Sequence, residues 1–125
     1  MNQVVTFLLT QNPDAAIKFY RDTLGLTYVR DDGYALVFDM NGIGLRISKV
    51  PQFTPAKHTV LGWETDDIAL DIADLFKKGV SFEHYSNMGQ DELGVCTFPG
   101  GSKVAWFKDP DGNVLSISQS EPRAS

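Results

Sequence analysis

Two charged side chains, Arg46 and Glu64, lie in apolar stretches at positions where a ligand could meet them. Strand alternation puts each of them opposite the bulky residues of its own segment, Leu45 and Ile47 in one case and Trp63 in the other. A guanidinium in a hollow binds a carboxylate or phosphate, and a carboxylate there accepts from an amine or serves as a general base. The same two charges also suit an ion pair with each other, so both interpretations stay open.

Aromatic residues are the second group with a chemical use. Phe7, Phe38, Phe98 and one member of the adjacent pair Trp106 and Phe107 are predicted to line an apolar hollow that suits a flat organic ligand. Neighbouring residues of a strand point to opposite faces, so one of the pair faces the helices and the other faces the hollow. The sequence does not decide which, and packing in a core explains the same aromatics equally well.

Nucleophilic and nucleotide chemistry find no support in the motifs. His58 begins an expected strand and His84 lies inside one, and neither has an identifiable serine or cysteine nucleophile nearby. Cys96 stands in the apolar segment 94–98 and is expected to be a small core or surface residue. No Gly-x-Gly-x-x-Gly or P-loop pattern is present, so we expect no nucleotide.

Composition narrows the class of protein. A chain of 125 residues can form one domain with a core, and 42% hydrophobic and 22% charged residues are typical of globular proteins. The net charge of -5 and the scattered basic residues argue against a nucleic acid partner. No apolar run approaches the roughly 20 residues that cross a bilayer, the first residues show no signal pattern, and a single cysteine forms no intrachain disulfide. We therefore expect a cytoplasmic protein without a membrane partner.

Two halves of the chain show the same order of expected elements, a strand, a helix and then further strands. In the first half we expect a helix over 12–24 and strands at 4–10, 27–30, 34–40 and 44–49. In the second half we expect a helix that begins after Asp66 or Asp67 and ends at Gly79, and strands at 58–65, 81–86, 95–98, 103–108 and 114–118. The looser segment 50–57 joins the halves, and the polar segment 87–93 is expected to be a loop or lid beside a pocket.

Local signals set the ends and faces of these elements. Asn12 is a good helix N-cap, and Asp32-Gly33 and Asn41-Gly42 are strong two-residue hairpin signals. Bulky residues mark the helix-covered side of each strand. In the first strand the bulkier set is Val5, Phe7 and Leu9, although its separation from Thr6, Leu8 and Thr10 is less clear.

The segment 104–117 is the most informative part of the chain. An apolar strand runs into Asp-Pro-Asp-Gly-Asn at 109–113, where the proline fixes φ and the glycine supplies a positive φ, and a second apolar strand follows at once. Together with Phe-Tyr-Arg-Asp-Thr-Leu-Gly-Leu at 19–26, this turn resembles the glyoxalase, bleomycin-resistance and extradiol-dioxygenase superfamily with its vicinal-oxygen-chelate fold. The resemblance implies an α+β fold in a single domain. Two βαβββ modules, at about 4–49 and 58–119, would form one curved mixed sheet with helices on its outer face.

The resemblance also says where a metal would be held. Metal enzymes of this superfamily place one His or Glu on each of four strands around a divalent cation. Carried over onto this chain, those positions fall on Val5, Arg46, Val60 and Ser116. Valine has no donor atom, arginine repels the ion, and one serine hydroxyl is a poor ligand. Shifting by two residues brings in His58 without partners, so we expect no metal and no cofactor.

The missing ligands favour a metal-independent protein that binds or sequesters a small organic molecule, as antibiotic resistance proteins of the bleomycin type do. The alternatives are a metal-dependent lyase, isomerase or dioxygenase of the glyoxalase type, a metal-free enzyme using Arg46 and Glu64, and a dimeric interaction module. The resemblance also implies a homodimer. Glu64 is the candidate catalytic residue, and the predicted ligand-binding residues are Phe7, Phe38, Arg46, Val60, Glu64, Phe98, Trp106 and Ser116.

Overall fold

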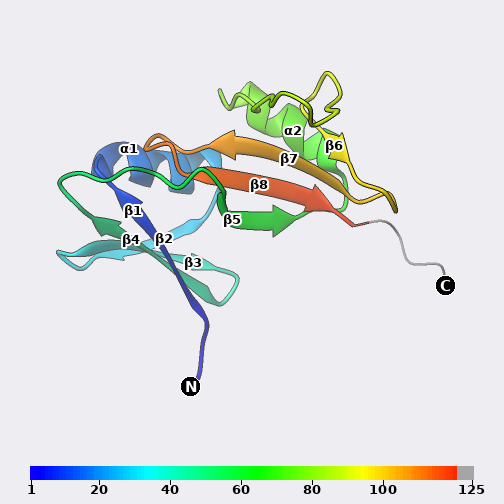
Figure 1. Cartoon of the computed structure of the whole chain (residues 1–125). Coiled ribbons are helices and arrows are strands. Elements are labelled where there is room, and N and C mark those ends of the chain that lie inside the picture. The colour runs from blue at the N-terminus through cyan, green and yellow to red at the C-terminus, as the bar shows by residue number, and fades with distance from the viewer. Residues whose placement is uncertain (121–125) are drawn as a thin grey trace. The chain divides into compact units, whose positions relative to one another are not determined.

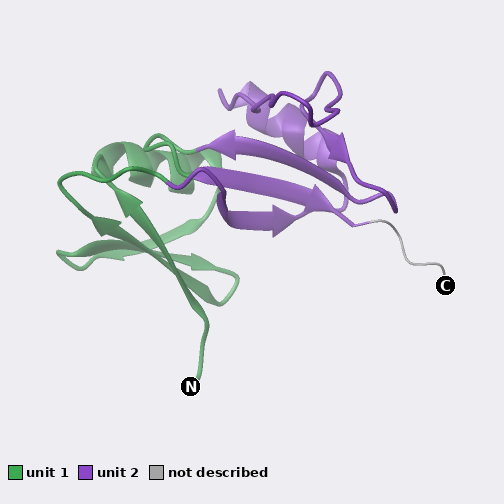
Figure 2. Ribbon diagram, in the orientation of Figure 1, with its two compact units in different colours: residues 1–55, 109–113 green, residues 56–108, 114–125 purple. Residues whose placement is uncertain are grey.

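The computed structural model describes residues 1–120, and the chain divides into two compact units (Figures 1 and 2). Unit 1 comprises Met1–Pro55 together with the turn Asp109–Asn113, and unit 2 comprises Ala56–Lys108 together with the strand that begins at Val114. The division after Pro55 falls inside the segment predicted to join two modules. Each unit holds one four-stranded sheet, so the βαβββ plan is confirmed. The hydrogen bonds divide the strands into two sheets, whereas one curved sheet was expected.

Unit 1 contains a mixed sheet in the order β1-β4-β3-β2. Strand β1 is parallel to β4, and the other neighbours are antiparallel. Between β1 and β2 lie a short α-helix, α1 (Pro13–Lys18), and a π-helical turn, η1 (Phe19–Thr23). The strands are β1 (Val5–Thr10), β2 (Thr27–Asp31), β3 (Ala35–Met40) and β4 (Ile43–Lys49).

Local chemistry explains where the elements of unit 1 begin and turn. The Asn12 side chain accepts from the Ala15 backbone and caps α1, as predicted. The expected single helix changes to a π turn because the Leu24 amide donates to the Phe19 carbonyl, five residues earlier. Asn41 and Gly42 have φ values of 53° and 93°, which confirms the two-residue hairpin between β3 and β4.

The core of unit 1 lies on the face of the sheet that the helical segment covers. Leu36, Phe38, Leu45 and Ile47 are at most 1% exposed, and the Tyr20 ring packs on Phe38 with 5.9 Å between ring centroids. Phe38 was predicted to line the ligand hollow. It pairs in register with Leu45 and therefore points to the covered face, so this prediction is corrected.

Strand β1 reverses the expected assignment of faces. Leu8 and Thr10 are buried, whereas Val5, Phe7 and Leu9 are 43%, 65% and 39% exposed. The expectation that the bulkier side chains face the helices gave the opposite result, because a threonine with hydrogen-bond partners can also be buried. The Thr10 hydroxyl is hydrogen-bonded on both sides, which makes its complete burial possible.

The turn at 109–113 joins β7 (Lys103–Lys108) to β8 (Val114–Gln119). It belongs to unit 1, where a buried carboxylate organises it. Asp109 is 6% exposed, and its Oδ2 accepts from the Tyr20 hydroxyl at 2.6 Å and from Asn113 Nδ2 at 2.8 Å. Its Oδ1 accepts from the backbone amides of Asp111 and Asn113, each at 2.9 Å. Burial raises the pKa of the Asp109 carboxyl, and burial together with that carboxyl raises the pKa of Tyr20. The two segments that carried the family resemblance are therefore bonded to each other.

Unit 2 contains a mixed sheet in the order β5-β8-β7-β6, with β5 parallel to β8. Its helix, α2 (Ile68–Lys77), is capped by Asp67, whose side chain accepts from the Leu70 amide at 3.1 Å. Helix α2 contacts β8. None of the helices within residues 1–120 is long and apolar enough to span a membrane. The strands are β5 (Thr59–Glu64), β6 (Cys96–Thr97), β7 (Lys103–Lys108) and β8 (Val114–Gln119).

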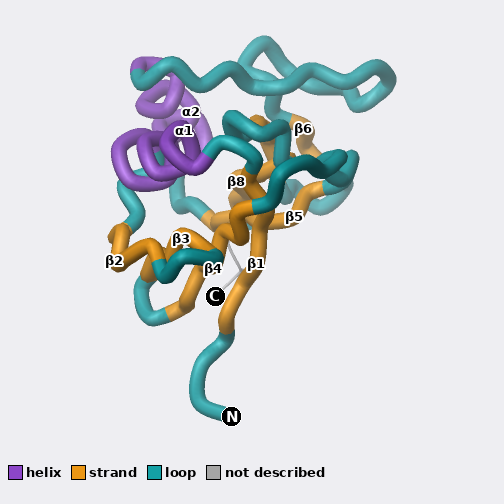
Figure 3. Tube along the Cα trace, turned by 90° about the vertical axis from the view of Figure 1, so that its left-hand side faces the viewer, coloured by secondary structure: helices purple, strands orange, loops and turns teal. Residues whose placement is uncertain are grey.

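The chain between α2 and β7 is mostly loop (Figure 3). The strand expected at 81–86 is reduced to one bridge between Phe82 and Phe107, so His84 lies outside any strand. The reason is a side chain that takes the place of a neighbouring strand. Gln90 Nε2 donates to the carbonyls of Glu83 and Gly94, and its Oε1 accepts from the Tyr85 amide.

Candidate functional site

The two faces of β7 are distinct, and this decides which aromatic is available to a ligand. Phe107 is completely buried, and its ring packs on Phe82 with 5.4 Å between centroids. Trp106 is half-buried on the other, open face of the sheet of unit 2. There it meets Tyr85 edge to face, with 5.7 Å between ring centroids.

A pocket of about 360 Å³ lies beside this aromatic pair. Volumes of this size are found in small-molecule sites, which cover roughly 300–1,000 Å³. The Trp106 and Tyr85 rings, Met88 and Val114 give the pocket an apolar lining. Lys57 and His58, which precede β5, and Thr59, its first residue, complete the lining, and no carboxylate lines the pocket. The pocket thus offers aromatic faces together with one ammonium group and one imidazole.

The same open face of the sheet carries two more predicted residues. Trp106, Ser116 and Gly62 are aligned across β7, β8 and β5. A Cβ at Gly62 would lie 2.5 Å from Ser116 Oγ, so the missing side chain of this glycine makes room for the serine hydroxyl. Val60 is 37% exposed on β5, the edge strand of this sheet.

The loop that supplies Tyr85 and Met88 is held in shape by its own side chains. Besides the three bonds made by Gln90, Asp91 Oδ1 accepts from the amides of Leu93 and Val95, each at 2.9 Å. The Cys96 thiol donates to the Met88 carbonyl at 3.1 Å. The segment 87–93 was predicted to be a loop beside a pocket, and the structure confirms that it is a loop and that Met88 lines the pocket.

The predicted charged residues each have a partner inside their own unit. Arg46, on the open face of the sheet of unit 1, forms an ion pair with Asp32 at 2.7 Å. Glu64, at the end of β5, accepts from the Ser120 hydroxyl at 2.9 Å. Asp32 also accepts from the amides of Tyr34 and Ala35, so the β2–β3 hairpin holds Arg46 in place. The hydrogen bonds from the Ala35 amide, the Arg46 guanidinium and the Tyr34 amide lower the pKa of Asp32 to about 2.

This ion pair predicts a pH-dependent stability. Because the pKa of Asp32 in the folded state lies below its usual value of 3.8, its ionised form stabilises the fold above that pH, and this contribution is lost as the pH falls toward about 2. An Asp32→Asn variant is therefore expected to be less stable than the wild type at pH 7, with a difference that shrinks between pH 4 and pH 2. Urea unfolding at a series of pH values measures this. A difference that stays constant over the whole series would contradict it.

The residues at the superfamily's metal positions do not fit a divalent cation. Val5 and Val60 have no donor atom, Arg46 is already paired with Asp32, and Ser116 offers one hydroxyl. In the part of the chain that the structure describes, no three His, Cys, Asp or Glu side chains come together in an arrangement that could hold a metal ion.

The structure brings together only part of the predicted ligand-binding set. Trp106 lines the pocket, Ser116 and Val60 lie on the same sheet, and Phe98, 40% exposed, follows β6. Phe7 is exposed on β1 of unit 1. The prediction omitted six lining residues. Lys57, His58, Tyr85 and Met88 lie in loops, where strand alternation gives no guide, and Thr59 and Val114 are the first residues of β5 and β8.

A family model described as Glyoxalase/Bleomycin resistance protein/Dioxygenase superfamily matches residues 1–117 of this chain. No curated protein matches it.

Several solved structures share the fold over nearly their whole length. An antibiotic-binding protein from a Streptomyces species is 24% identical, with 97% of each chain covered and a TM-score of 0.69. A lactoylglutathione lyase from Agrobacterium tumefaciens is 22% identical, with 93% of this chain and 91% of that chain covered and a TM-score of 0.70. A superfamily member from Sphaerobacter thermophilus is 21% identical, with 96% and 98% covered and a TM-score of 0.74. At these identities the similarity shows the fold alone.

Proposed function

We propose, since this chain belongs to the Glyoxalase/Bleomycin resistance protein/Dioxygenase superfamily, that it binds a small organic molecule without a metal. The site is the pocket on the open face of the sheet of unit 2. The observation that carries this proposal is the edge-to-face pair of Trp106 and Tyr85 beside a volume of about 360 Å³. Rigid aromatic rings that stay partly uncovered at a pocket provide large contact area for a flat ligand.

The charges at this pocket indicate what kind of ligand it takes. Lys57 and His58 are its basic lining residues, and both are exposed. An ammonium group beside aromatic faces favours a planar molecule that carries an acidic group, because the acid pairs with Lys57 while the ring stacks on Trp106. The ligand class is therefore an aromatic or conjugated organic acid.

The relatives support binding and also define the alternative. One neighbour is an antibiotic-binding protein, which supports sequestration, and another is a lactoylglutathione lyase, which supports an enzyme. Binding is favoured here because the positions that would hold a metal carry two valines, a paired arginine and a serine. Glu64 stays the candidate catalytic residue of the alternative, a metal-free enzyme.

The binding proposal is tested with a thermal-shift screen of planar aromatic acids, matched neutral amides and matched amines. We expect the acids to stabilise the protein most. For the best acid, Trp106→Ala is expected to weaken binding by about tenfold or more, since central aromatic contacts often contribute above 2 kcal/mol. The matched control is Tyr34→Ala, whose ring is 82% exposed in unit 1. Equal affinities of the Trp106→Ala and Tyr34→Ala proteins would exclude this pocket as the site.

Metal independence is tested separately by elemental analysis of tag-free protein, before and after incubation with Zn²⁺, Ni²⁺, Mn²⁺ and Fe²⁺. We expect no metal to survive dialysis, since a divalent cation needs several donors that these positions lack. Near-stoichiometric retained metal would overturn this part of the proposal and move the protein to the glyoxalase type of metalloenzyme.

We also propose that the protein is a homodimer in the cytoplasm. The exposed apolar row of Val5, Phe7 and Leu9 on the edge strand β1 supports self-association, because such rows are usually covered in assemblies. Light scattering after size-exclusion chromatography measures the mass. A monomer at high micromolar concentration would count against the dimer.

A further inference from the structure

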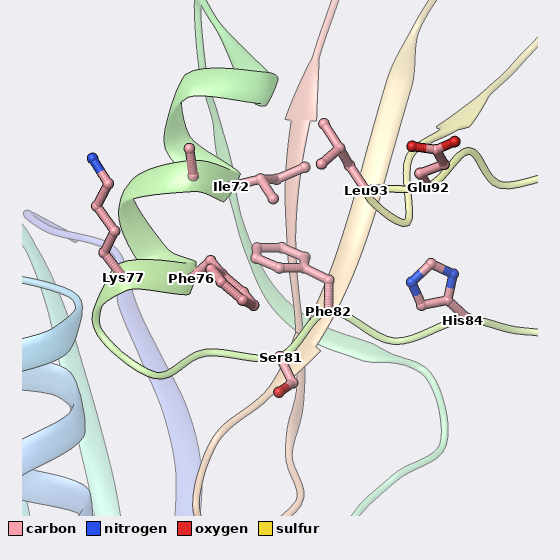
Figure 4. A pocket seen from close by; sticks show the side chains of 9 residues that line it. Ile72, Phe76, Lys77, Ser81, Phe82, His84, Glu92 and Leu93 are labelled. Carbon is pink, nitrogen blue, oxygen red and sulfur yellow. The ribbon is translucent and has the colours of Figure 1, made fainter.

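A second and larger cavity lies in unit 2, between α2 and the loop that follows it (Figure 4). Its volume is about 520 Å³, which is ample for a small organic molecule. Ile72, Phe76, Phe82 and Leu93 contribute its apolar lining. It shares none of its lining residues with the pocket beside Trp106.

The apolar lining is unusually open to solvent. Phe76, on the last turn of α2, is 70% exposed, and Leu93, on the opposite loop, is 46% exposed. Phe82 lies between them, with its ring directed toward the helix (Figure 4). Scattered exposed apolar residues are ordinary, but two that face each other across a concave surface are typical of a binding site.

One end of the cavity is polar, with His84 and Glu92 on the same side of Phe82 (Figure 4). Within residues 1–120, neither side chain takes part in a hydrogen bond or ion pair, whereas the nearby Glu83 is paired with Lys108 at 3.2 Å. The Glu92 carboxylate is thus available to a ligand. The Lys77 side chain also borders the cavity, but it extends away from Phe82 along the other side of α2.

We propose that this cavity binds an amphipathic amine, an occupant beyond the function proposed above. The ammonium group pairs with the Glu92 carboxylate and donates to the His84 imidazole, while an aromatic or aliphatic body lies on Phe76, Phe82 and Leu93. A carboxylic acid of the same shape meets Glu92 and is repelled, so the cavity discriminates by charge.

The loop at 84–93 belongs to both sites. Tyr85 and Met88 line the pocket beside Trp106, and His84, Glu92 and Leu93 line the cavity beside α2. The two sites are nevertheless separable by experiment, because their other lining residues come from different segments. Backbone amide shifts at 72–77 report the cavity beside α2, and shifts at 57–59 and 106 report the other pocket.

The test uses three probes of one shape, 4-phenylbutylamine, 4-phenyl-1-butanol and 4-phenylbutyrate, titrated by calorimetry at low ionic strength and followed by amide chemical shifts. We expect the amine to bind at least tenfold more tightly than the alcohol, and the acid to bind more weakly still. Glu92→Gln is expected to lower the affinity for the amine to the level of the affinity for the alcohol. Asp74→Asn, which removes a charge elsewhere on α2, is the matched control and is expected to change little.

A second variant covers the apolar part of the site. Phe76→Ala is expected to weaken the binding of the amine and of the alcohol by a similar factor of about five to ten, because the substitution removes contact area and not charge. The proposal is overturned if the amine does not bind at millimolar concentration, if all three probes bind equally, or if Glu92→Gln leaves the amine unaffected. Changes in amide chemical shift that are confined to residues 57–59 and 106 also overturn the proposal. Because the readout is local, the failure of the aromatic-acid site and the failure of this one are distinguishable.

Discussion

Replacing Asp109 with alanine is expected to lower the free energy of unfolding by about 3 to 5 kcal/mol. The carboxylate accepts from the Tyr20 hydroxyl, from Asn113 Nδ2 and from two backbone amides in a buried setting. Its removal leaves the Tyr20 hydroxyl and the two backbone amides without this acceptor, whereas Asn113 Nδ2 keeps its bond to the Leu9 carbonyl. Each unsatisfied buried group costs roughly 1 to 3 kcal/mol before relaxation. Urea unfolding followed by circular dichroism measures the loss.

Two further variants separate this network from a general loss of charge. Tyr20→Phe removes one donor and keeps the ring, which is completely buried, so we expect a smaller loss of about 1 to 3 kcal/mol. Asp66→Ala removes an exposed carboxylate that precedes α2 and is expected to cost under about 0.5 kcal/mol. If Asp109→Ala cost no more than the Asp66 variant, the buried carboxylate would not be what holds the turn against α1 and η1 in unit 1.

The second large effect concerns two neighbours on β7. Phe107→Ala is expected to lower the free energy of unfolding by about 3 to 5 kcal/mol, because the ring is completely buried and packs on Phe82. Trp106→Ala is expected to cost much less stability, because the indole is half-buried on the open face beside Tyr85. Thermal unfolding of the two variants compares the losses directly.

The same two variants are expected to show the opposite order in a binding measurement. At a temperature where both are folded, Trp106→Ala is expected to lose affinity for aromatic acids, whereas Phe107→Ala is expected to retain it. This crossed result distinguishes a ligand contact from a core residue. If Phe107→Ala lost as much affinity as Trp106→Ala without unfolding, the pocket would depend on the core of unit 2 and not on the indole.

Sequence reasoning predicted the features that depend on nearby residues. The turn at Asn41-Gly42 follows from two residues that tolerate positive φ, and the start of α2 follows from the side chain of Asp67. The α+β class and the repeated βαβββ order are confirmed for the same reason, since hydrophobic alternation and capping are properties of short segments. Two motifs that lie far apart in the sequence, at 19–26 and 109–113, together identify the superfamily, and the structure adds the hydrogen bond that joins them.

Residues whose environment depends on distant parts of the chain were predicted less well. The strand expected at 81–86 is a loop because the Gln90 side chain forms hydrogen bonds with backbone groups of this segment. Phe38 was predicted on the open face, and Leu8 and Thr10 were not expected to be buried, because register with β4 and the bonds of Thr10 decide their burial. Pocket residues such as Tyr85 and Met88 come from that loop, so strand alternation could not find them.

The sequence by itself determined the order of most elements, the turn at Asn41-Gly42 and the superfamily, because these depend on residue identity and on neighbours along the chain. Only the tertiary structure decided that Arg46 pairs with Asp32, that Trp106 and not Phe107 faces the open side, and that Asp109 bonds Tyr20. Such pairings depend on sheet register and on burial. Those arise when segments far apart in the sequence pack together and exclude water.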